Sequence, residues 1–242
     1  FGPPGTGKTM CAEALAGALG KKLIDVSYAE IESKYVGETG KNIRAAFSKA
    51  AEMDCVLFFD EADSILGRRM TNVTQAADHG VNVARAVMLK ELDQFEGVVA
   101  FATNLARNFD GAFVRRILQH VLIPLPSLEC RGLLWQRMIP QAVPGRNQLN
   151  WDLLAEESDG FSGGDIKNAV LISLAEAVAR EPKDRFVTSQ DIRNAIASVR
   201  RGQEHVGSRP VTRYQETVDL ESTVKPAPSV EDSSSEDAVQ GA

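Results

Sequence analysis

The residues best suited to chemistry lie at the start of the printed sequence, where residues 2–9 have the spacing GxxxxGK[ST]. In such a loop, successive backbone N–H groups and the N-terminus of the following helix form a cradle for the β- and γ-phosphates of a nucleotide. Lys8 would bring a positive charge to these phosphates, and the Thr9 hydroxyl would bind Mg²⁺. A Gly/Pro-rich surface turn is disfavoured, because an amphipathic helix pattern follows directly. The residues predicted to contact ATP are Gly2, Pro3, Pro4, Gly5, Thr6, Gly7, Lys8, Thr9 and Met10.

Two adjacent acids follow the apolar run 56–59. Asp60 at the end of a strand would hold Mg²⁺, directly or through water. Glu61 would orient and polarise an attacking water molecule. Alone, an acid after a strand marks only the beginning of a loop. Together with a phosphate-binding loop, the pair predicts nucleotide hydrolysis.

Polar side chains after the next apolar run complete the predicted site. Asn104 follows residues 98–103, and this strand should lie beside the one that ends at Asp60, so the Asn104 amide would lie near the γ-phosphate and the water. Arg115 and Arg116 come 11 and 12 residues later. Adjacent arginines usually form a solvated face or pair with a carboxylate, but these two could reach the γ-phosphate of a neighbouring subunit. In that case catalysis requires an oligomer.

The elements that must position these residues begin with short apolar runs. Continuous runs are typical of strands buried on both faces of a parallel sheet. The four predicted strands cover 23–26, 56–59, 98–102 and 121–125. Two helices are predicted between them, one after Lys8 that ends at Gly20 and one over 39–51. The apolar faces predicted for these helices consist of Cys11, Ala14, Leu15, Ala18 and Leu19 in the first and Ile43, Phe47 and Ala50 in the second.

The pattern becomes wholly helical after Pro126. The predicted helices cover 128–138, 151–157, 164–180 and 189–200, and two of them carry capping boxes: Ser162 with Asp165 and Thr188 with Asp191. We therefore predict an α/β fold of the P-loop NTPase type, a parallel sheet sandwiched by helices and followed by a small all-α lid. The predicted parts are 1–126 for the nucleotide-binding subdomain, 127–202 for the lid and 203–242 for an acidic, disordered tail.

Charge is concentrated at the C-terminal end. The net charge of the 242 residues is −6, and residues 214–242 hold seven acids against one lysine, so the remainder is neutral. A neutral core gives no electrostatic reason to expect nucleic acid as a partner. The acidic end is too poor in apolar residues to order itself.

The three cysteines, Cys11, Cys55 and Cys130, are far apart and show no CxxC spacing. This argues against a disulfide scaffold and a zinc site, and predicts buried thiols at Cys11 and Cys55. A reducing compartment follows, so the predicted location is cytoplasmic. We also expect no membrane span, because no apolar run approaches the roughly 18–20 residues required, and no signal peptide is seen at Phe1.

The motifs occur in the order and spacing of classical AAA ATPases, and the resemblance covers about residues 1–200. It rests on residues 2–9, 56–61, 102–104 and 110–116, with 33–39 similar to the first pore loop and 160–166 to the sensor-2 region. The resemblance is nearest to stand-alone bacterial AAA proteins, which share the adjacent arginines with the microtubule-severing and membrane-remodelling branch. It implies a five-stranded parallel sheet with a helical lid, a homohexamer, and ATP bound between the two subdomains near Gly163 and Gly164.

Under the same resemblance, Tyr35, Val36 and Gly37 form a loop that projects into the channel of the ring and grips an extended polypeptide. The alternative is a hydrophobic staple leading into the following helix. The favoured hypothesis is an ATP-driven machine that remodels or unfolds protein substrates through a hexameric pore. The second hypothesis is a nucleotide-dependent assembly or scaffold ring without translocation.

Three departures from the family pattern matter. Only Phe1 precedes Gly2, so we expect the first strand of the sheet to be missing and the chain to be a fragment. The sensor-2 stretch has no arginine, which leaves the lid without a cationic contact to the γ-phosphate. No HExxH occurs, so a zinc protease is not expected in this stretch.

Overall fold

The computed structural model describes residues 1–27, 31, 38–67, 76–105 and 109–205. It divides into one unit from Phe1 to Arg209 and a second from Pro210 to Ala242, and the second lies outside the described residues. The predicted pore loop around Tyr35 and most of the predicted acidic tail also lie outside them. None of the helices in the described ranges combines the length and the apolar character that a membrane crossing requires.

The centre of the fold is a parallel sheet of three strands: β1 (Leu23–Ser27), β2 (Val56–Asp60) and β3 (Val99–Phe101), in the order β1-β2-β3. Ser27 is paired with Asp60, and Leu57 with Val99. The first four residues of β2 are completely covered because β2 lies between two strands and two helical layers. Its continuous apolar sequence is the pattern expected for such a position.

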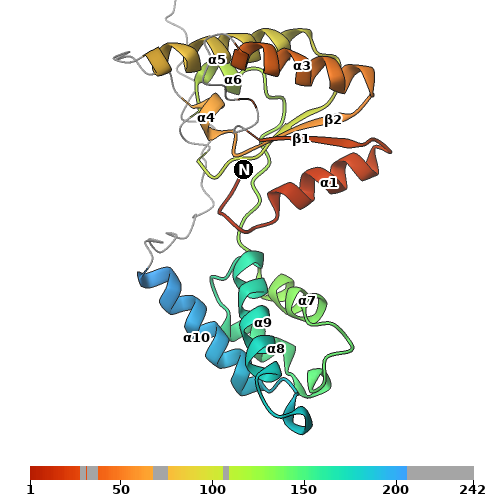
Figure 1. Cartoon of the computed structure of the whole chain (residues 1–242), viewed down its shortest axis with the longest axis vertical. Coiled ribbons are helices and arrows are strands. Elements are labelled where there is room, and N and C mark those ends of the chain that lie inside the picture. Colours follow the sequence, from red (N-terminus) through yellow and green to blue (C-terminus); the bar gives the residue numbers. More distant parts are fainter. Residues whose placement is uncertain (28–30, 32–37, 68–75, 106–108, 206–242) are drawn as a thin grey trace, which may run out of the picture. The chain divides into compact units, whose positions relative to one another are not determined.

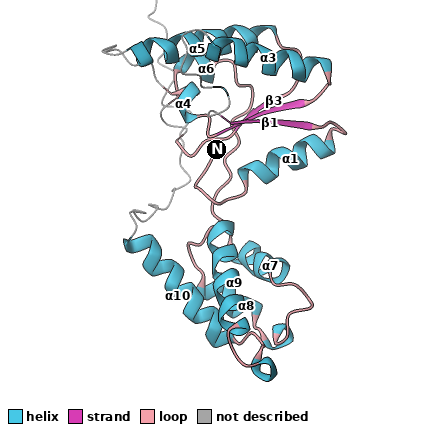
Figure 2. Cartoon of the chain, in the orientation of Figure 1, coloured by secondary structure: helices cyan, strands magenta, loops and turns pink. Residues whose placement is uncertain are grey.

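Helices cover both faces of the sheet. Figure 1 shows α3 (Glu38–Glu52) and α5 (Ala76–Gln94) on one side of the strands and α1 (Lys8–Ala18) on the other, and Figure 2 shows the same layers by type of element. The α/β sandwich predicted from the sequence is therefore confirmed. The predicted face of α3 is also confirmed, because Ile43, Phe47 and Ala50 are its buried apolar side chains.

Side chains of β2 point alternately to the two helical layers and pack against both. Leu57 and Phe59 belong to the large core that also contains Met88 of α5, whereas Phe58 packs with Ala12 of α1. Successive side chains of a strand point to opposite faces, so each layer receives its own anchors. This packing fixes the carboxyl end of β2, where Asp60 lies.

The first helix presents a different face from the predicted one. Ala12 and Ala16 are buried in α1, while Leu15 and Leu19 are 43% and 46% exposed. Alanines recur all around this helix, so hydrophobic periodicity alone does not distinguish its faces, and the small alanines allow the closest approach to the sheet. The Cys11 thiol is consequently exposed, against the prediction, whereas Cys55 is buried as predicted.

The fourth predicted strand, residues 121–125, is wrong for this chain. The segment has no strand conformation, and its backbone contacts are with Phe1: the N-terminal amine donates to the oxygen of Val121 (2.8 Å), and the N–H of Ile123 donates to the oxygen of Phe1 (2.8 Å). The sheet of the described residues thus has three strands, rather than the five implied by the family resemblance.

Short helices connect the sheet to a second, wholly helical core. After α4 (Asp63–Leu66) and α6 (Gly111–Val114), the helical elements are α7 (Leu128–Met138), η2 (Arg146–Gln148), α8 (Trp151–Glu157), α9 (Gly163–Val178), η3 (Pro182–Asp184) and α10 (Ser189–His205). Trp135, Ile166 and Ile192 are completely buried in their shared core. The indole N–H of Trp135 donates to the hydroxyl of Ser158 at 3.0 Å, which satisfies the one polar atom of this large side chain.

Both predicted capping boxes are present. The Ser162 hydroxyl accepts from the N–H of Asp165, whose carboxylate accepts from the N–H of Ser162. Thr188 and Asp191 exchange the same two bonds at the start of α10. Each box satisfies two backbone N–H groups within four residues. The start of each helix could therefore be predicted from those four residues.

Candidate functional site

The loop of residues 2–7 joins Phe1 to α1 and depends on its glycines. A Cβ atom on Gly2 would lie 2.1 Å from the backbone oxygen of Ile123, so only glycine fits. Gly5 and Gly7 have φ angles of 74° and 91°, a conformation that favours glycine. The Thr6 hydroxyl donates to the backbone oxygen of Pro3 at 2.9 Å and closes the loop upon itself.

Backbone N–H groups of this loop are available to an anion. Within the described residues, none of the N–H groups of residues 5–10 donates to another protein group, and Gly7 gives α1 no side-chain cap. The first helical turn contains no acidic residue that would compete for these donors. An uncapped helix N-terminus preceded by left-handed glycines is a favourable site for phosphate.

The ammonium group of Lys8 folds back over the loop. Its Nζ donates to the backbone oxygens of Gly2 (3.1 Å) and Pro3 (2.8 Å) and to Oδ1 of Asn104 (2.6 Å). Partial burial lowers the pKa of Lys8, an effect that the nearby Asp60 carboxylate partly opposes. All three acceptors are neutral, so anionic phosphate oxygens would be stronger partners for the same ammonium group.

Thr9 and Asp60 meet across 51 residues of sequence. The Thr9 hydroxyl donates to Oδ2 of Asp60 at 2.8 Å, because α1 and β2 are packed together. A hydroxyl and one carboxylate are hard oxygen ligands, and Mg²⁺ in nucleotide sites typically takes one or two protein oxygens together with phosphate and water. The pair fits Mg²⁺. No cluster of three or more His, Cys, Asp or Glu side chains suited to another metal occurs in the described residues.

Glu61 follows Asp60 in an unusual backbone conformation. Its φ angle is 49°, in the left-handed region, and its N–H donates to Oδ1 of Asp60 at 2.8 Å. A non-glycine residue in this region costs about 1 kcal/mol or more, and such residues occur often at functional sites. The conformation leaves the Glu61 side chain exposed, with no polar partner among the described residues.

Two residues that the sequence analysis did not single out organise the end of β3. The Thr103 hydroxyl donates to Oδ1 of Asp63 and accepts from the N–H of Leu105 (2.8 Å), and the Thr103 backbone oxygen accepts from the N–H of Gly2 (3.2 Å). Buried Thr103 therefore connects the phosphate loop, α4 and the segment that carries Asn104. The sequence signal that could have identified this pair is Asp63, a second acid three residues after Asp60. Its carboxylate needs a hydrogen-bond donor, and the Thr103 hydroxyl supplies one.

The start of α9 contacts the phosphate loop. The N–H of Gly164 donates to the backbone oxygen of Gly5 at 3.0 Å, and a Cβ on Gly163 would lie 3.3 Å from the same oxygen. A Cβ on Gly5 would in turn lie 2.6 Å from the Ser162 hydroxyl. The glycines on both sides permit this approach, and Gly163 and Gly164 lie beside the loop. Their nearness to the nucleotide stays a prediction.

The two arginines that follow α6 have different surroundings. Arg116 binds Asp93 through Nε (2.7 Å) and Nη2 (2.9 Å). The exposed Arg115 side chain has no hydrogen bond or ion pair to any described residue. Neither arginine makes a polar contact with the phosphate loop, residues 2–7, of its own subunit.

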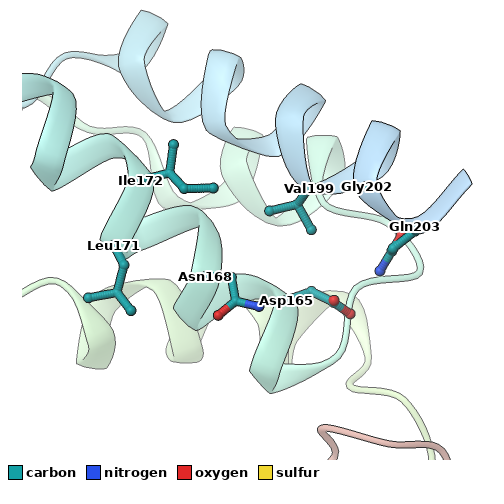
Figure 3. A pocket seen from close by; sticks show the side chains of 7 residues that line it. All are labelled: Asp165, Asn168, Leu171, Ile172, Val199, Gly202 and Gln203. Atoms are coloured by element: carbon teal, nitrogen blue, oxygen red, sulfur yellow. The ribbon is translucent and has the colours of Figure 1, made fainter. Parts of the chain in front are cut away.

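A separate hollow of about 490 Å³ lies between α9 and α10. Figure 3 shows its lining, which comprises Asp165, Asn168, Leu171, Ile172, Val199, Gly202 and Gln203. It contains none of the predicted nucleotide-binding residues. The phosphate-loop region is therefore the candidate site, on the strength of its contacts.

Comparison with known proteins identifies a family for this chain. The model of the ATPase family associated with various cellular activities (AAA) matches residues 1–125. Spastin of Drosophila virilis is 32% identical over 219 residues, which cover 83% of this chain and 28% of that protein. Spastin of Anopheles gambiae is 32% identical over 222 residues, covering 83% and 26%. The chain thus spans about a quarter of the length of these curated relatives, which are insect proteins, and nearness to bacterial proteins stays a prediction.

Solved structures give the same result. The crystal structure of the FIGL-1 AAA domain in complex with ADP has a TM-score of 0.70 and 27% identity, covering 88% of this chain and 71% of that one. A second crystal structure of the FIGL-1 AAA domain has a TM-score of 0.68 at 27% identity, covering 82% and 69%. Because the family model matches more than half of its residues, the chain belongs to the AAA family of ATPases.

Proposed function

We propose that this chain is the motor part of a homohexameric ring that hydrolyses MgATP to remodel or unfold protein substrates. The observation that carries the proposal is the convergence of four groups at one loop: Lys8 bonded to Asn104, and Thr9 bonded to Asp60. These pairs are 96 and 51 residues apart in sequence, so only the fold brings them together. The arrangement supports a triphosphate seated on the loop.

Each residue has a distinct task in this proposal. The N–H groups of residues 5–10 and the Lys8 ammonium bind the β- and γ-phosphates, while Thr9 and Asp60 hold Mg²⁺, which would offset phosphate charge. The Glu61 carboxylate orients a water molecule and accepts its proton. The water oxygen bonds to the γ-phosphorus as the bond to the bridging oxygen breaks, which gives ADP and phosphate.

Asn104 contributes by orientation. Its Oδ1 holds the Lys8 ammonium at 2.6 Å, so its amide nitrogen is turned away from Lys8 and can face the γ-phosphate or the water. A neutral amide placed there helps align the nucleophile without adding charge. The FIGL-1 AAA domain was crystallised in complex with ADP, which supports nucleotide binding at the equivalent fold.

Two further expectations lead us to propose a ring and a protein substrate. Arg115 and Arg116 carry exposed positive charge with no contact to their own described loop residues, which favours action on the nucleotide of a neighbour. Tyr35, which lies outside the described residues, would grip an extended polypeptide by packing. The absence of side-chain specificity in such a grip favours protein substrates of many sequences.

The test uses the complete chain, MgATP and a fluorescent folded protein that carries an unstructured tail. Wild type should hydrolyse ATP and extinguish the fluorescence. Tyr35→Ala should keep hydrolysis but lose unfolding, and the matched control Tyr35→Phe should keep both. Hydrolysis with release of a bound partner but without unfolding would favour the scaffold ring, whereas no affinity for MgATP would refute the whole proposal.

A further inference from the structure

Arg131 of α7 is a buried cation with three separate partners. Its side chain is 8% exposed, and each guanidinium nitrogen bonds to a different residue. Nε donates to the backbone oxygen of Ala155 (2.9 Å), Nη1 donates to that of Pro126 (3.0 Å), and Nη2 lies 3.0 Å from Oδ1 of Asp159. A charge buried to this degree needs partners for its donors, and the planar guanidinium fixes the positions of its acceptors relative to one another.

Two of these partners belong to segments that are far apart in sequence. Pro126 ends residues 121–126, the entry segment, which leads from the nucleotide-binding subdomain to α7. Asp159 lies in residues 158–162, the lid loop, which leads from α8 to α9. Arg131 therefore ties the entry segment to the lid loop.

Both segments lead to backbone contacts at the phosphate loop. In the entry segment, the N–H of Ile123 donates to the oxygen of Phe1 at 2.8 Å, directly before that loop. The lid loop continues into α9, where the N–H of Gly164 donates to the oxygen of Gly5 at 3.0 Å. Arg131 thus bonds to the two segments that approach the phosphate loop at different points.

A second arginine, Arg200 of α10, holds the lid loop from another helix. Its Nη2 donates to the backbone oxygens of Glu157 (2.9 Å) and Asp159 (3.1 Å). Its guanidinium lies 5.1 Å from the centre of the ring of Phe161, which is completely buried. The lid loop is therefore fixed to the helical core, and Arg131 connects it to the entry segment.

The bond between α9 and Gly5 sets the direction of a phosphate donor. The oxygen of Gly5 and the N–H of Thr6 belong to one planar peptide group. The N–H of Gly164, which holds that oxygen, consequently also fixes the direction of the Thr6 N–H. Gly5 has a φ angle of 74° and no side chain to restrict it, so this peptide rotates easily once the bond is lost.

We propose that Arg131 is a positioning residue for nucleotide binding, which keeps α9 against Gly5 by tying the lid loop to the entry segment. The inference rests on the proposed function, in which the nucleotide is seated on the phosphate loop. The alternative is that Arg131 only satisfies the oxygen of Ala155 in the last turn of α8, a role that would affect folding stability alone.

The main test compares Arg131→Met with Arg146→Met in the complete chain. Arg146 is the matched control, because its Nε and Nη2 donate to the backbone oxygens of Ile139 and Gln136, at 3.0 Å each, and not to the entry segment or the lid loop. Both substitutions should lower the midpoint of urea unfolding. Only Arg131→Met should weaken the binding of MgADP in calorimetry, by about 3- to 10-fold, as expected for the net loss of one hydrogen bond.

Two further readouts separate positioning from folding. In Arg131→Met, the KM for MgATP should rise by the same factor while kcat stays within about twofold of wild type, because the reacting groups are untouched. Gly164→Pro removes the N–H that bonds to Gly5, at a position in the first helical turn where proline is tolerated. Its double variant with Arg131→Met should bind MgADP within about twofold of Gly164→Pro alone, since both changes break one contact.

Three results would overturn the inference. They are wild-type MgADP affinity in Arg131→Met, an equal loss of affinity in Arg146→Met, and additive losses in the double variant. If Arg131→Met does not fold, Arg131→Lys and Arg146→Lys replace the two methionine variants with the same expected order, because lysine cannot reach all three acceptors. These results leave the proposed function intact when wild type binds MgADP and hydrolyses MgATP, and a wild type that does neither refutes both.

Discussion

Replacement of Glu61 by glutamine isolates the chemical step from nucleotide binding. The Glu61 carboxylate is exposed and has no polar partner among the described residues, whereas Asp60 beside it holds both Thr9 and the N–H of Glu61. The substitution keeps the shape of the side chain and the left-handed backbone at this position. It removes the negative charge and, with it, the ability to accept a proton.

The expected size of the effect follows from that role. Loss of a general base costs about 10²- to 10⁴-fold in rate. At about 1.36 kcal/mol per tenfold, the barrier rises by about 2.7–5.4 kcal/mol. The free energy of unfolding should change by less than about 0.5 kcal/mol, since no native contact is lost. The affinity for MgATP should stay within about twofold, because the phosphate-binding groups are untouched.

The assay compares three proteins as complete chains: wild type, Glu61→Gln and Glu13→Gln. Glu13 is an exposed glutamate of α1, so its replacement removes the same charge without touching the predicted water. Phosphate release under saturating MgATP gives kcat, and calorimetry gives the dissociation constant. The control should match wild type in both quantities.

Two outcomes would refute the reasoning. Hydrolysis by Glu61→Gln within threefold of wild type would mean that another group activates the water. A loss of MgATP affinity of more than tenfold would mean that Glu61 supports binding, against its lack of contacts with the loop.

Three other substitutions test the packing around the site and the helical core. Gly5→Ala should lower stability by about 1–2 kcal/mol in urea unfolding, because φ is 74° and the new Cβ would meet the Ser162 hydroxyl; an unchanged midpoint would contradict the glycine requirement. Trp135→Phe should cost about 2 kcal/mol, seen as a lower melting temperature, through a lost buried hydrogen bond and lost volume; stability equal to wild type would show that the bond is dispensable. Burial opposes ionisation of Asp191, but hydrogen bonds led by that from the Thr188 backbone lower its pKa below 3.8. The ionised Asp191 therefore stabilises the fold above that value, and this contribution is lost as pH falls through and below it. Asp191→Asn should consequently lose less stability than wild type between about pH 6 and pH 3. Parallel pH profiles of the two proteins would refute the assignment.

Several features were determined by the sequence alone because they depend on residues near one another. The spacing of residues 2–9 predicted the phosphate loop, and four residues sufficed for each capping box. The uninterrupted apolar run before Asp60 predicted a central strand, which β2 is. In each case the governing physics is local: periodicity, caps and backbone freedom act over a few residues.

Other features were decided only by the tertiary structure. The sequence predicted no element over residues 76–94, where α5 lies, and the buried face of α1 was misjudged because alanines surround that helix. Residues 121–125 have the apolar sequence of a strand, yet a strand also needs a paired neighbour, and apolarity alone does not say whether one is present.

The candidate site divides in the same way. Lys8, Thr9, Asp60, Glu61 and Asn104 could be named from motif and order along the chain. The hydrogen bond between Thr103 and Asp63 joins residues 40 positions apart, and the ion pair between Asp93 and Arg116 joins residues 23 positions apart. Which distant side chains meet depends on the packing of whole elements, and no local pattern contains that information.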